Sequence, residues 1–327
     1  MEDDPFAVFG DDVLIETSVV VAEENTENSV RDPSCGVLVF HEGTEASLLY
    51  FVQNGLEKRS PDKDPTDQVI NLIDEFCYRR HWMMHVGPEK GKVLENHLAQ
   101  CLDAHLLKNR AKPFLVLEVG TYCGYSSIRM CRTILSKLMD ANKCFHVMSV
   151  DVNPHSQMVA KQLVALAGLE AYVTFGLLTD LESNRDELSQ SIWAQVDVFS
   201  TEYGSSGLDF VFLDHDKDMY LSDIVQLERA KLIRAGSFVA ADNILFFRLD
   251  DYQRHMQKLA AKGFVETRLD MGKLEYVLKE QEYETTVDLR DGMGTKNRKV
   301  WVSDPLQFLM FLSVSQRAEL TQYLQDP

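Results

Sequence analysis

The residues with the strongest chemical signature are oxygen donors that follow two apolar segments. Asp214 closes the apolar run 208–213, and Asp242 and Asn243 follow the run 237–241. If these runs are neighbouring parallel strands, the donors meet at one edge of a sheet. Two carboxylates and an amide oxygen, completed by water and substrate oxygens, suit the octahedral coordination of magnesium. We therefore predict a magnesium site here; the alternative is solvated loop acids or helix N-caps.

A lysine lies close to this predicted metal site. Lys217 follows Asp214 by three residues. A lysine beside a divalent cation can have its pKa lowered, which lets it act as a general base near neutral pH. The spacing alone leaves open the alternative of an ordinary surface lysine.

A glycine turn and a more distant acid predict a nucleoside site. Gly120 and Gly124 follow the apolar run 114–119 and allow the backbone to turn tightly and approach a ligand. Asp151 closes the next run, 145–150, and its carboxylate can accept hydrogen bonds from both ribose hydroxyls. Nicotinamide dehydrogenases share this feature, but the turn lacks their GxGxxG fingerprint for a pyrophosphate. We therefore predict a nucleoside ligand without phosphates.

These residues need a sheet whose strands end on the same side. Apolar runs alternate with helical stretches, which predicts a doubly wound, mostly parallel, seven-stranded α/β sheet with helices on both faces. The predicted strands are 114–119, 145–150, 172–175, 208–213, 237–241, 263–270 and 298–303. The predicted helices of the alternating part start near 126 and span 156–167 and 219–234. A polar connection between the last two strands predicts an antiparallel hairpin at the sheet edge.

The chain is expected to contain one catalytic domain with two appendages. Residues 1–44 form an acidic leader, whose first 33 residues hold ten acids and one base, and we expect it to be disordered. A docking or regulatory segment is the alternative. The catalytic domain is predicted at 45–303, and a C-terminal helical extension at 304–327 with its helix over 305–324. The apolar residues 37–40 also predict a short strand.

Composition excludes several classes of protein. Acids outnumber bases 51 to 33, a net charge of −18, which disfavours a nucleic-acid partner. No run approaches the roughly 18 apolar residues of a membrane span, and the N-terminus lacks signal-peptide features, so we expect a cytoplasmic protein. The six cysteines form no CxxC pair and are expected to be free thiols. A monomer is our default expectation.

The same residues make the chain resemble the catechol O-methyltransferase family. Five segments carry the resemblance in order: 81–91, 117–126, 150–154, 211–218 and 241–243. Overall it extends from about residue 46 to about 303. The resemblance implies a Rossmann-like methyltransferase fold that uses S-adenosylmethionine and Mg²⁺ to methylate one oxygen of a catechol or related vicinal diol.

The resemblance also implies roles for individual residues. Asp214, Asp242 and Asn243 would bind Mg²⁺, and Lys217 would take the proton from the attacking hydroxyl. The implied cofactor-binding residues are Val86, Glu118, Gly120, Tyr122, Ser126, Asp151 and His215. The implied substrate-binding residues are Trp82, Met84, Lys217, Asn243 and Glu275. Glu275 lies in a Leu-Glu-Tyr segment, and Glu282 nearby is its rival for contact with the non-reacting hydroxyl.

Some positions depart from the family pattern. His85 stands where the family usually has an asparagine, and Asp216 stands where an aromatic residue is common. These departures surround the adenine and substrate walls, whereas the metal residues match. Two other functions are alternatives to a methyltransferase. A catalytically weak relative could act as a binding or regulatory module, and a nicotinamide dehydrogenase is disfavoured by the missing fingerprint.

Overall fold

The computed structural model of the protein describes residues 44–58, 62–80, 83–108, 112–138, 145–178, 207–244, 248–278 and 298–311. The leader with its predicted strand at 37–40, and also Trp82 and Glu282, lie outside these residues. Four cysteines within them, Cys77, Cys101, Cys123 and Cys131, are buried and free, which confirms the expectation for these four.

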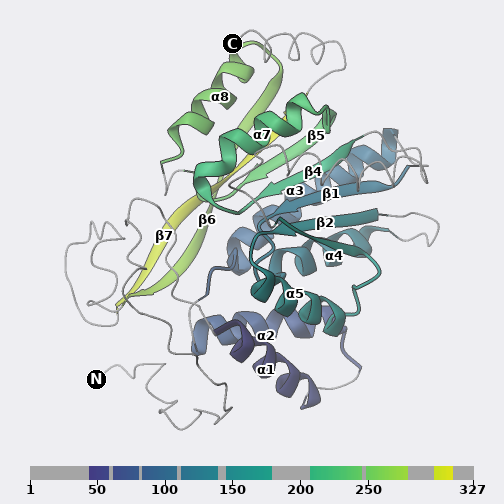
Figure 1. Cartoon of the computed structure of the whole chain (residues 1–327), viewed down its shortest axis with the longest axis vertical. Helices are drawn as coiled ribbons and strands as arrows, with labels where there is room; N and C mark the ends of the chain where they lie inside the picture. Colours follow the sequence, from purple (N-terminus) through teal and green to yellow (C-terminus); the bar gives the residue numbers. More distant parts are fainter. Residues whose placement is uncertain are drawn as a thin grey trace.

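Within the described residues, seven strands form one sheet in the order β3-β2-β1-β4-β5-β7-β6 (Figure 1). Their bounds are β1 (Phe114–Val119), β2 (Phe145–Asp151), β3 (Val173–Leu177), β4 (Leu208–Leu213), β5 (Ile233–Ala241), β6 (Val265–Leu278) and β7 (Arg298–Phe311). Strands β1 to β5 are parallel, and β7 runs antiparallel to both of its neighbours. The order reverses at β1, where chain crossovers lead to opposite sides, so the predicted doubly wound sheet is confirmed. Ligands bind outside such a switch point.

Helices cover both faces of this sheet (Figure 1). Their bounds are α1 (Thr44–Glu57), α2 (Pro65–Arg79), α3 (Gly87–Lys108), α4 (Tyr125–Lys137), α5 (Pro154–Leu166), α7 (Tyr220–Arg229) and α8 (Asp250–Ala261), with a 3-10 turn, η3, over Lys217–Met219. Helices α7 and α8 lie on one face, and α3, α4 and α5 on the other. Helices α1 and α2 pack outside α4 and α5.

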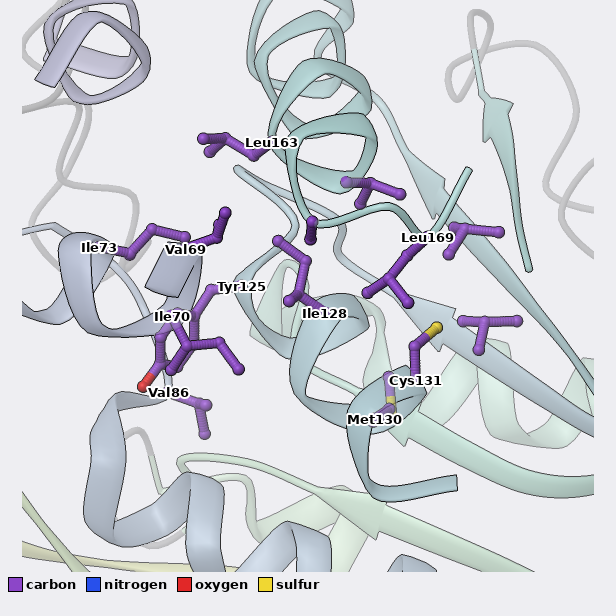
Figure 2. Packing of buried hydrophobic residues seen from close by; sticks show 14 of the residues in the cluster. Val69, Ile70, Ile73, Val86, Tyr125, Ile128, Met130, Cys131, Leu163 and Leu169 are labelled. Atoms are coloured by element: carbon purple, nitrogen blue, oxygen red, sulfur yellow. The ribbon is translucent and has the colours of Figure 1, made fainter. Parts of the chain in front are cut away.

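The two faces of β1 belong to two separate hydrophobic cores. Phe114 and Val116 join the core beneath α2 to α5, whereas Leu115 and Leu117 join the core beneath α7 and α8. This division follows from the two-residue period of a strand, and a strand buried on both faces reads as a continuous apolar run. Figure 2 shows the first core, where side chains of α2, α4 and α5 interdigitate.

Local capping explains where two helices begin. Asp64 accepts a hydrogen bond from Thr66 N at 2.8 Å, with Pro65 in the first turn of α2. Asn153 likewise accepts from the backbone of His155, and Pro154 starts α5. An N-cap side chain satisfies a free backbone donor, and proline fits the first turn because its missing N–H is not needed there. The Asn153 cap fixes the start of α5 directly after Asp151, the predicted ribose acid.

The C-terminal strand corrects one prediction and confirms another. A helix was expected from Pro305, but β7 continues through Phe311, so residues 305–311 are strand; residues 312–324 lie outside the described part of the chain. The predicted antiparallel hairpin at the sheet edge is confirmed: β6 is the edge strand, and β7 lies between β6 and β5. Apart from Gln307, the run 305–311 has no polar side chain, and such a short, mostly apolar run does not distinguish a strand from a helix.

The helix predicted at 219–234 is also shorter than expected. Helix α7 ends at Arg229, and β5 already begins at Ile233. Lys231 takes a positive φ of 60° in the connection, which ends the helix. The other predicted strands and helices of the domain match the structure within a few residues, except that β6 and β7 extend well past their predicted ends.

A buried carboxylate ties the C-terminal half of α3 to three strands. Asp209 in β4 accepts hydrogen bonds from Leu115 N at 2.9 Å and pairs with His105 of α3 at 3.0 Å. It also pairs with Arg234 of β5. Buried charges need such compensation, so this cluster holds α3 in place against the sheet and thereby positions the other end of the helix near the site.

Candidate active site

The strand tips bring the predicted metal residues together. Asp214 N donates to Val119 O at 2.9 Å, and Asp242 N donates to Leu213 O at 3.0 Å. The hydrogen-bonded ladder therefore continues one residue beyond the strands, so the loops after β1, β4 and β5 leave the sheet side by side. Asp242 lies close enough to Asp214 for its charge to raise the pKa of the Asp214 carboxyl.

The glycine turn packs directly on the metal loop. Gly120 has a φ of +100°, and a Cβ at this position would come within 2.3 Å of the Asp214 carbonyl oxygen. A side chain is excluded both by this conformation and by this contact. The predicted cofactor turn and the predicted metal loop are therefore one continuous surface.

Two lysines compensate the two acids. Lys217 Nζ lies 2.9 Å from Asp214 Oδ1, and Lys90 Nζ lies 2.8 Å from both carboxylate oxygens of Asp242. Burial raises the pKa of Asp214, Lys217 lowers it, and the neighbouring Asp242 raises it further; the net shift is upward. The cluster holds two carboxylates and two ammonium groups and is therefore close to neutral.

Lys90 is the residue that the sequence analysis missed. It lies in the first turn of α3 and is fully buried. A signal was present, because Lys90 falls at helical spacing with Leu94, Leu98 and Leu102, all of them buried. A lysine on the apolar face of a helix needs a buried partner, and Asp242 provides it.

Lys217 is held by a tyrosine as well as by Asp214. Its Nζ donates to Tyr220 Oη at 2.9 Å, and that hydroxyl lies within hydrogen-bonding distance of the carbonyl oxygens of Leu213 and Asp242, at 2.8 and 3.1 Å. Tyr220 is fully buried. The tyrosine therefore joins the base candidate to both strand tips.

The third predicted metal residue has a special backbone. Asn243 has a φ of +63°, a conformation that asparagine tolerates better than most residues, and its N–H donates to Asp242 Oδ1 at 2.8 Å. No group of three or more His, Cys, Asp or Glu side chains that could hold a metal occurs among the described residues. The proposed donors are instead two carboxylates and an amide, a hard oxygen set that fits Mg²⁺.

Glu118 lies beneath the glycine turn rather than on its surface. Its carboxylate is fully buried and accepts hydrogen bonds from the hydroxyls of Ser126, Ser127 and Ser149. Burial raises its pKa to about 7, although the three serines lower it. Ser126 is thus also part of this buried layer, which supports the turn from below.

The predicted ribose acid is fixed by two backbone donors. Asp151 Oδ2 accepts from Tyr122 N at 2.7 Å, and Oδ1 accepts from Asn153 N at 2.8 Å. Tyr122 has a φ of 45°, so the turn after Gly120 bends towards the tip of β2. Each carboxylate oxygen keeps a further lone pair, which can accept a hydrogen bond from a diol.

His215 has a buried ring nitrogen without a hydrogen-bond partner among the described residues, next to this turn. Its Nε2 pairs with Asp223 Oδ2 at 2.7 Å, and its ring stacks on Tyr220 with centroids 5.0 Å apart. Its Nδ1 is buried and has no hydrogen-bond partner in the described part of the chain. Because buried polar atoms are normally paired, this nitrogen is a candidate contact for the predicted cofactor.

The loop before α3 divides its side chains between surface and core. Met84 is 46% exposed, whereas Val86 is buried with Tyr125 and Ile70 (Figure 2). Met84 is therefore accessible, and its contact with a substrate and that of Val86 with the cofactor stay predictions.

His85 of this loop points inward. Its Nε2 lies 3.4 Å from Asp74, and its ring meets Tyr125 edge-on at 4.9 Å. Burial would lower the pKa of His85, but Cys77 and Asp74 raise it to about 10. The departure from asparagine therefore places an imidazole between α2 and α4, against Asp74 and Tyr125.

The remaining substrate residues are only partly placed. Glu275 lies on β6, where it pairs with Trp301 of β7. On β7, Gln307 pairs with Leu269 of β6 and with the last residue of β5, so Glu275 lies beyond the end of β5. Because β6 runs in the same direction as β5, Glu275 lies beyond the carboxyl end of β5, at the same edge of the sheet as the metal loop. Its side chain, Trp82 and Glu282 lie outside what the structure describes, so their roles stay predictions.

Fold and site together define a class of protein. A doubly wound α/β sheet with an acid for a ribose, a glycine turn and a second pair of acids at its carboxyl edge is typical of enzymes that bind a nucleoside cofactor there. The chain belongs to the O-methyltransferase family, whose model matches residues 64–294. The resemblance found in the sequence is thereby confirmed.

Individual relatives agree with this family. Catechol O-methyltransferase from Bos taurus is 31% identical over 194 residues, which cover 59% of this chain and 60% of that protein. Catechol O-methyltransferase from Mus musculus is 30% identical over 216 residues, or 65% and 68% of the two chains. A transmembrane O-methyltransferase from Homo sapiens is 29% identical over 218 residues, or 67% and 62%. The match thus spans about three fifths of the bovine protein's length.

The last of these relatives is named for a membrane span. Among the helices of the described residues, none has both the length and the apolar character needed to cross a bilayer.

Proposed function

We propose that the protein transfers the methyl group of S-adenosylmethionine to an oxygen of a catechol or similar vicinal diol, with Mg²⁺ bound at the strand tips. The observation that carries the proposal is the juxtaposition of Lys217, Asp214 and Asp242 on the loop surface against which Gly120 packs. Such an arrangement offers a base, a metal site and a cofactor turn within one continuous surface.

The residues that would hold the metal are Asp214, Asp242 and Asn243. When bound, the ion would act as a Lewis acid that favours ionisation of a nearby hydroxyl and orients the diol. The raised pKa of Asp214 and its salt bridge with Lys217 are consistent with a carboxylate that needs a cation beside it.

Lys217 supplies the proton acceptor. Its Nζ, in the neutral form, takes the proton of the attacking hydroxyl, and Tyr220 and Asp214 hold that nitrogen in place. The oxygen then bonds to the methyl carbon as the carbon–sulfur bond breaks, and the electron pair stays on sulfur as S-adenosylhomocysteine. Positioning of the two reactants supplies much of the rate, and no covalent enzyme intermediate is required.

The cofactor would lie over the glycine turn. Asp151 would accept hydrogen bonds from the ribose hydroxyls, and the buried Nδ1 of His215 would face the adenine. Glu118 would support the turn from beneath through its serine contacts.

We also propose that the protein is cytoplasmic and monomeric and that its acceptor is a small molecule. Light scattering in solution measures the oligomeric state.

The experiment is methyl transfer from labelled S-adenosylmethionine to a panel of catechols, with Mg²⁺ and with excess chelator. Wild type is compared with Asp214→Asn and with Asp216→Asn, whose target is an exposed acid of the same loop that caps η3. We expect transfer that chelator and Asp214→Asn abolish and that Asp216→Asn retains.

Other outcomes separate the alternatives. Cofactor binding without transfer to any diol would favour another acceptor or a binding module with weak catalysis. Transfer that persists unchanged in chelator would refute the magnesium role, and no binding of S-adenosylmethionine would refute the proposal as a whole.

A further inference from the structure

We propose that Lys90 is a counter-ion that takes the place of the metal ion beside Asp242 and sets how tightly Mg²⁺ binds. This inference rests on the magnesium site of the proposed function. It assigns a role to a residue that is not itself a metal ligand. The carrying observation is the contact of one ammonium group with both oxygens of Asp242, at 2.8 Å each.

Burial makes this contact necessary. The side chains of Lys90 and Asp242 are only 1% and 2% exposed. An isolated buried carboxylate is strongly disfavoured unless a cation compensates it. Asp242 lies at the end of a central strand, and in the absence of a metal Lys90 compensates its charge.

The same cation opposes metal binding. Lys90 and Lys217 balance the charges of Asp242 and Asp214, so a divalent ion meets a nearly neutral cluster rather than two free carboxylates. An ammonium group so close to the ligand repels a second cation. Lys90 therefore stabilises the metal-free fold and weakens binding of the ion.

The direction of Asp242 does not depend on Lys90 alone. Asn243 N donates to Asp242 Oδ1 at 2.8 Å, and Asp242 N is held by Leu213 O. Removal of the lysine should therefore leave the carboxylate aimed as before. The main change is electrostatic, so removal of the lysine should increase the affinity for the metal ion.

The test compares wild type, Lys90→Met and Lys92→Met in the absence of cofactor and acceptor. Lys92 lies on the same helix, but its side chain is 68% exposed and 3.7 Å from Glu95, so Lys92→Met removes the same charge from the surface. Binding of Mn²⁺, as a paramagnetic substitute for Mg²⁺, is titrated by electron paramagnetic resonance, and Mg²⁺ is then used to displace it.

We expect Lys90→Met to bind the ion about tenfold more tightly than wild type, and Lys92→Met to bind it like wild type. Without metal, Lys90→Met should unfold at a temperature at least about 5 °C lower, and saturating Mg²⁺ should restore much of that loss. Equal or weaker metal affinity in Lys90→Met would overturn the inference.

A double variant keeps the test decisive if Lys90→Met does not fold. Lys90→Met combined with Asp242→Asn removes both charges, and recovery of folding supports the role of Lys90 as the counter-ion, whereas failure to fold contradicts it. The two proposals also separate. No metal binding in any of the variants refutes the magnesium site, whereas equal binding in all of them refutes only the role of Lys90.

Discussion

Gly120 lies against Asp214 so closely that a Cβ on the glycine would be 2.3 Å from the aspartate's carbonyl oxygen. The cofactor turn after β1 and the metal loop after β4 are therefore built as one unit. Movement of either loop shifts both parts of the proposed site.

Gly120→Ala tests this contact against a matched glycine. Gly168 also has a positive φ, +72°, but a Cβ there would meet nothing within 4 Å. Gly168→Ala should cost about 1–2 kcal/mol from backbone conformation alone, and Gly120→Ala should cost at least about 2 kcal/mol more because of the steric clash. Urea unfolding measures both, and equal losses would show that the loops can separate.

Glu118→Gln tests the buried carboxylate through pH. Burial raises the pKa of Glu118 to about 7, above its usual value near 4.5, so the folded state binds a proton more readily than the unfolded state between these values. The contribution of Glu118 to stability is therefore greatest below about pH 4.5 and is lost as pH rises through 7.

The variant should cancel this loss. Relative to wild type, the free energy of unfolding of Glu118→Gln should increase by about 3 kcal/mol between pH 4.5 and pH 8. Urea unfolding at several pH values gives the difference, in which the titration of other groups cancels. Parallel curves for the two proteins would contradict the raised pKa.

Tyr220→Phe tests how the base candidate is held. The change keeps the buried ring but removes the hydroxyl that accepts from Lys217 Nζ. Loss of the hydrogen bond from Lys217, together with the contacts of the hydroxyl with the carbonyl oxygens of Leu213 and Asp242, should lower kcat about tenfold. We expect little effect on the KM for S-adenosylmethionine. Steady-state kinetics with a catechol that proves to be an acceptor measure both constants.

Tyr252→Phe is the control for this change. Tyr252 meets Tyr220 edge-on at 5.8 Å, and its hydroxyl is buried without a hydrogen-bond partner in the described part of the chain. Its removal should leave kcat unchanged and should not reduce stability. A similar loss of kcat in both variants would indicate general damage to the core between α7 and α8.

Asp209→Ala tests the buried cluster that anchors α3. Removal of this carboxylate leaves Arg234 and His105 without their buried partner and should cost about 3–5 kcal/mol. Asp103→Ala is the comparison, because Asp103 is 58% exposed where it pairs with Lys137, and its loss should cost at most about 1 kcal/mol. Similar losses in urea unfolding would mean that the cluster does not anchor the helix.

Much of the architecture could be predicted from local pattern. Strands β1 and β4 are buried along their whole length, so each appears in the sequence as a mostly apolar stretch with a sharp polar end. Because parallel strands end at the same edge, the residues after them had to be neighbours. β7 escaped this logic, since its position between β5 and β6 depends on pairing with segments far away in the chain.

The sequence by itself determined the chemical groups of the site: Asp214, Lys217, Asp242 and Asn243 follow strands whose ends the apolar pattern marks. Only the tertiary structure decided how these groups are charged and held. The Lys90–Asp242 pair joins residues 152 positions apart, and the burial of Glu118 depends on serines from α4 and β2. Local pattern records which face of an element is apolar, whereas the partner of a buried charge is set by the packing of distant elements.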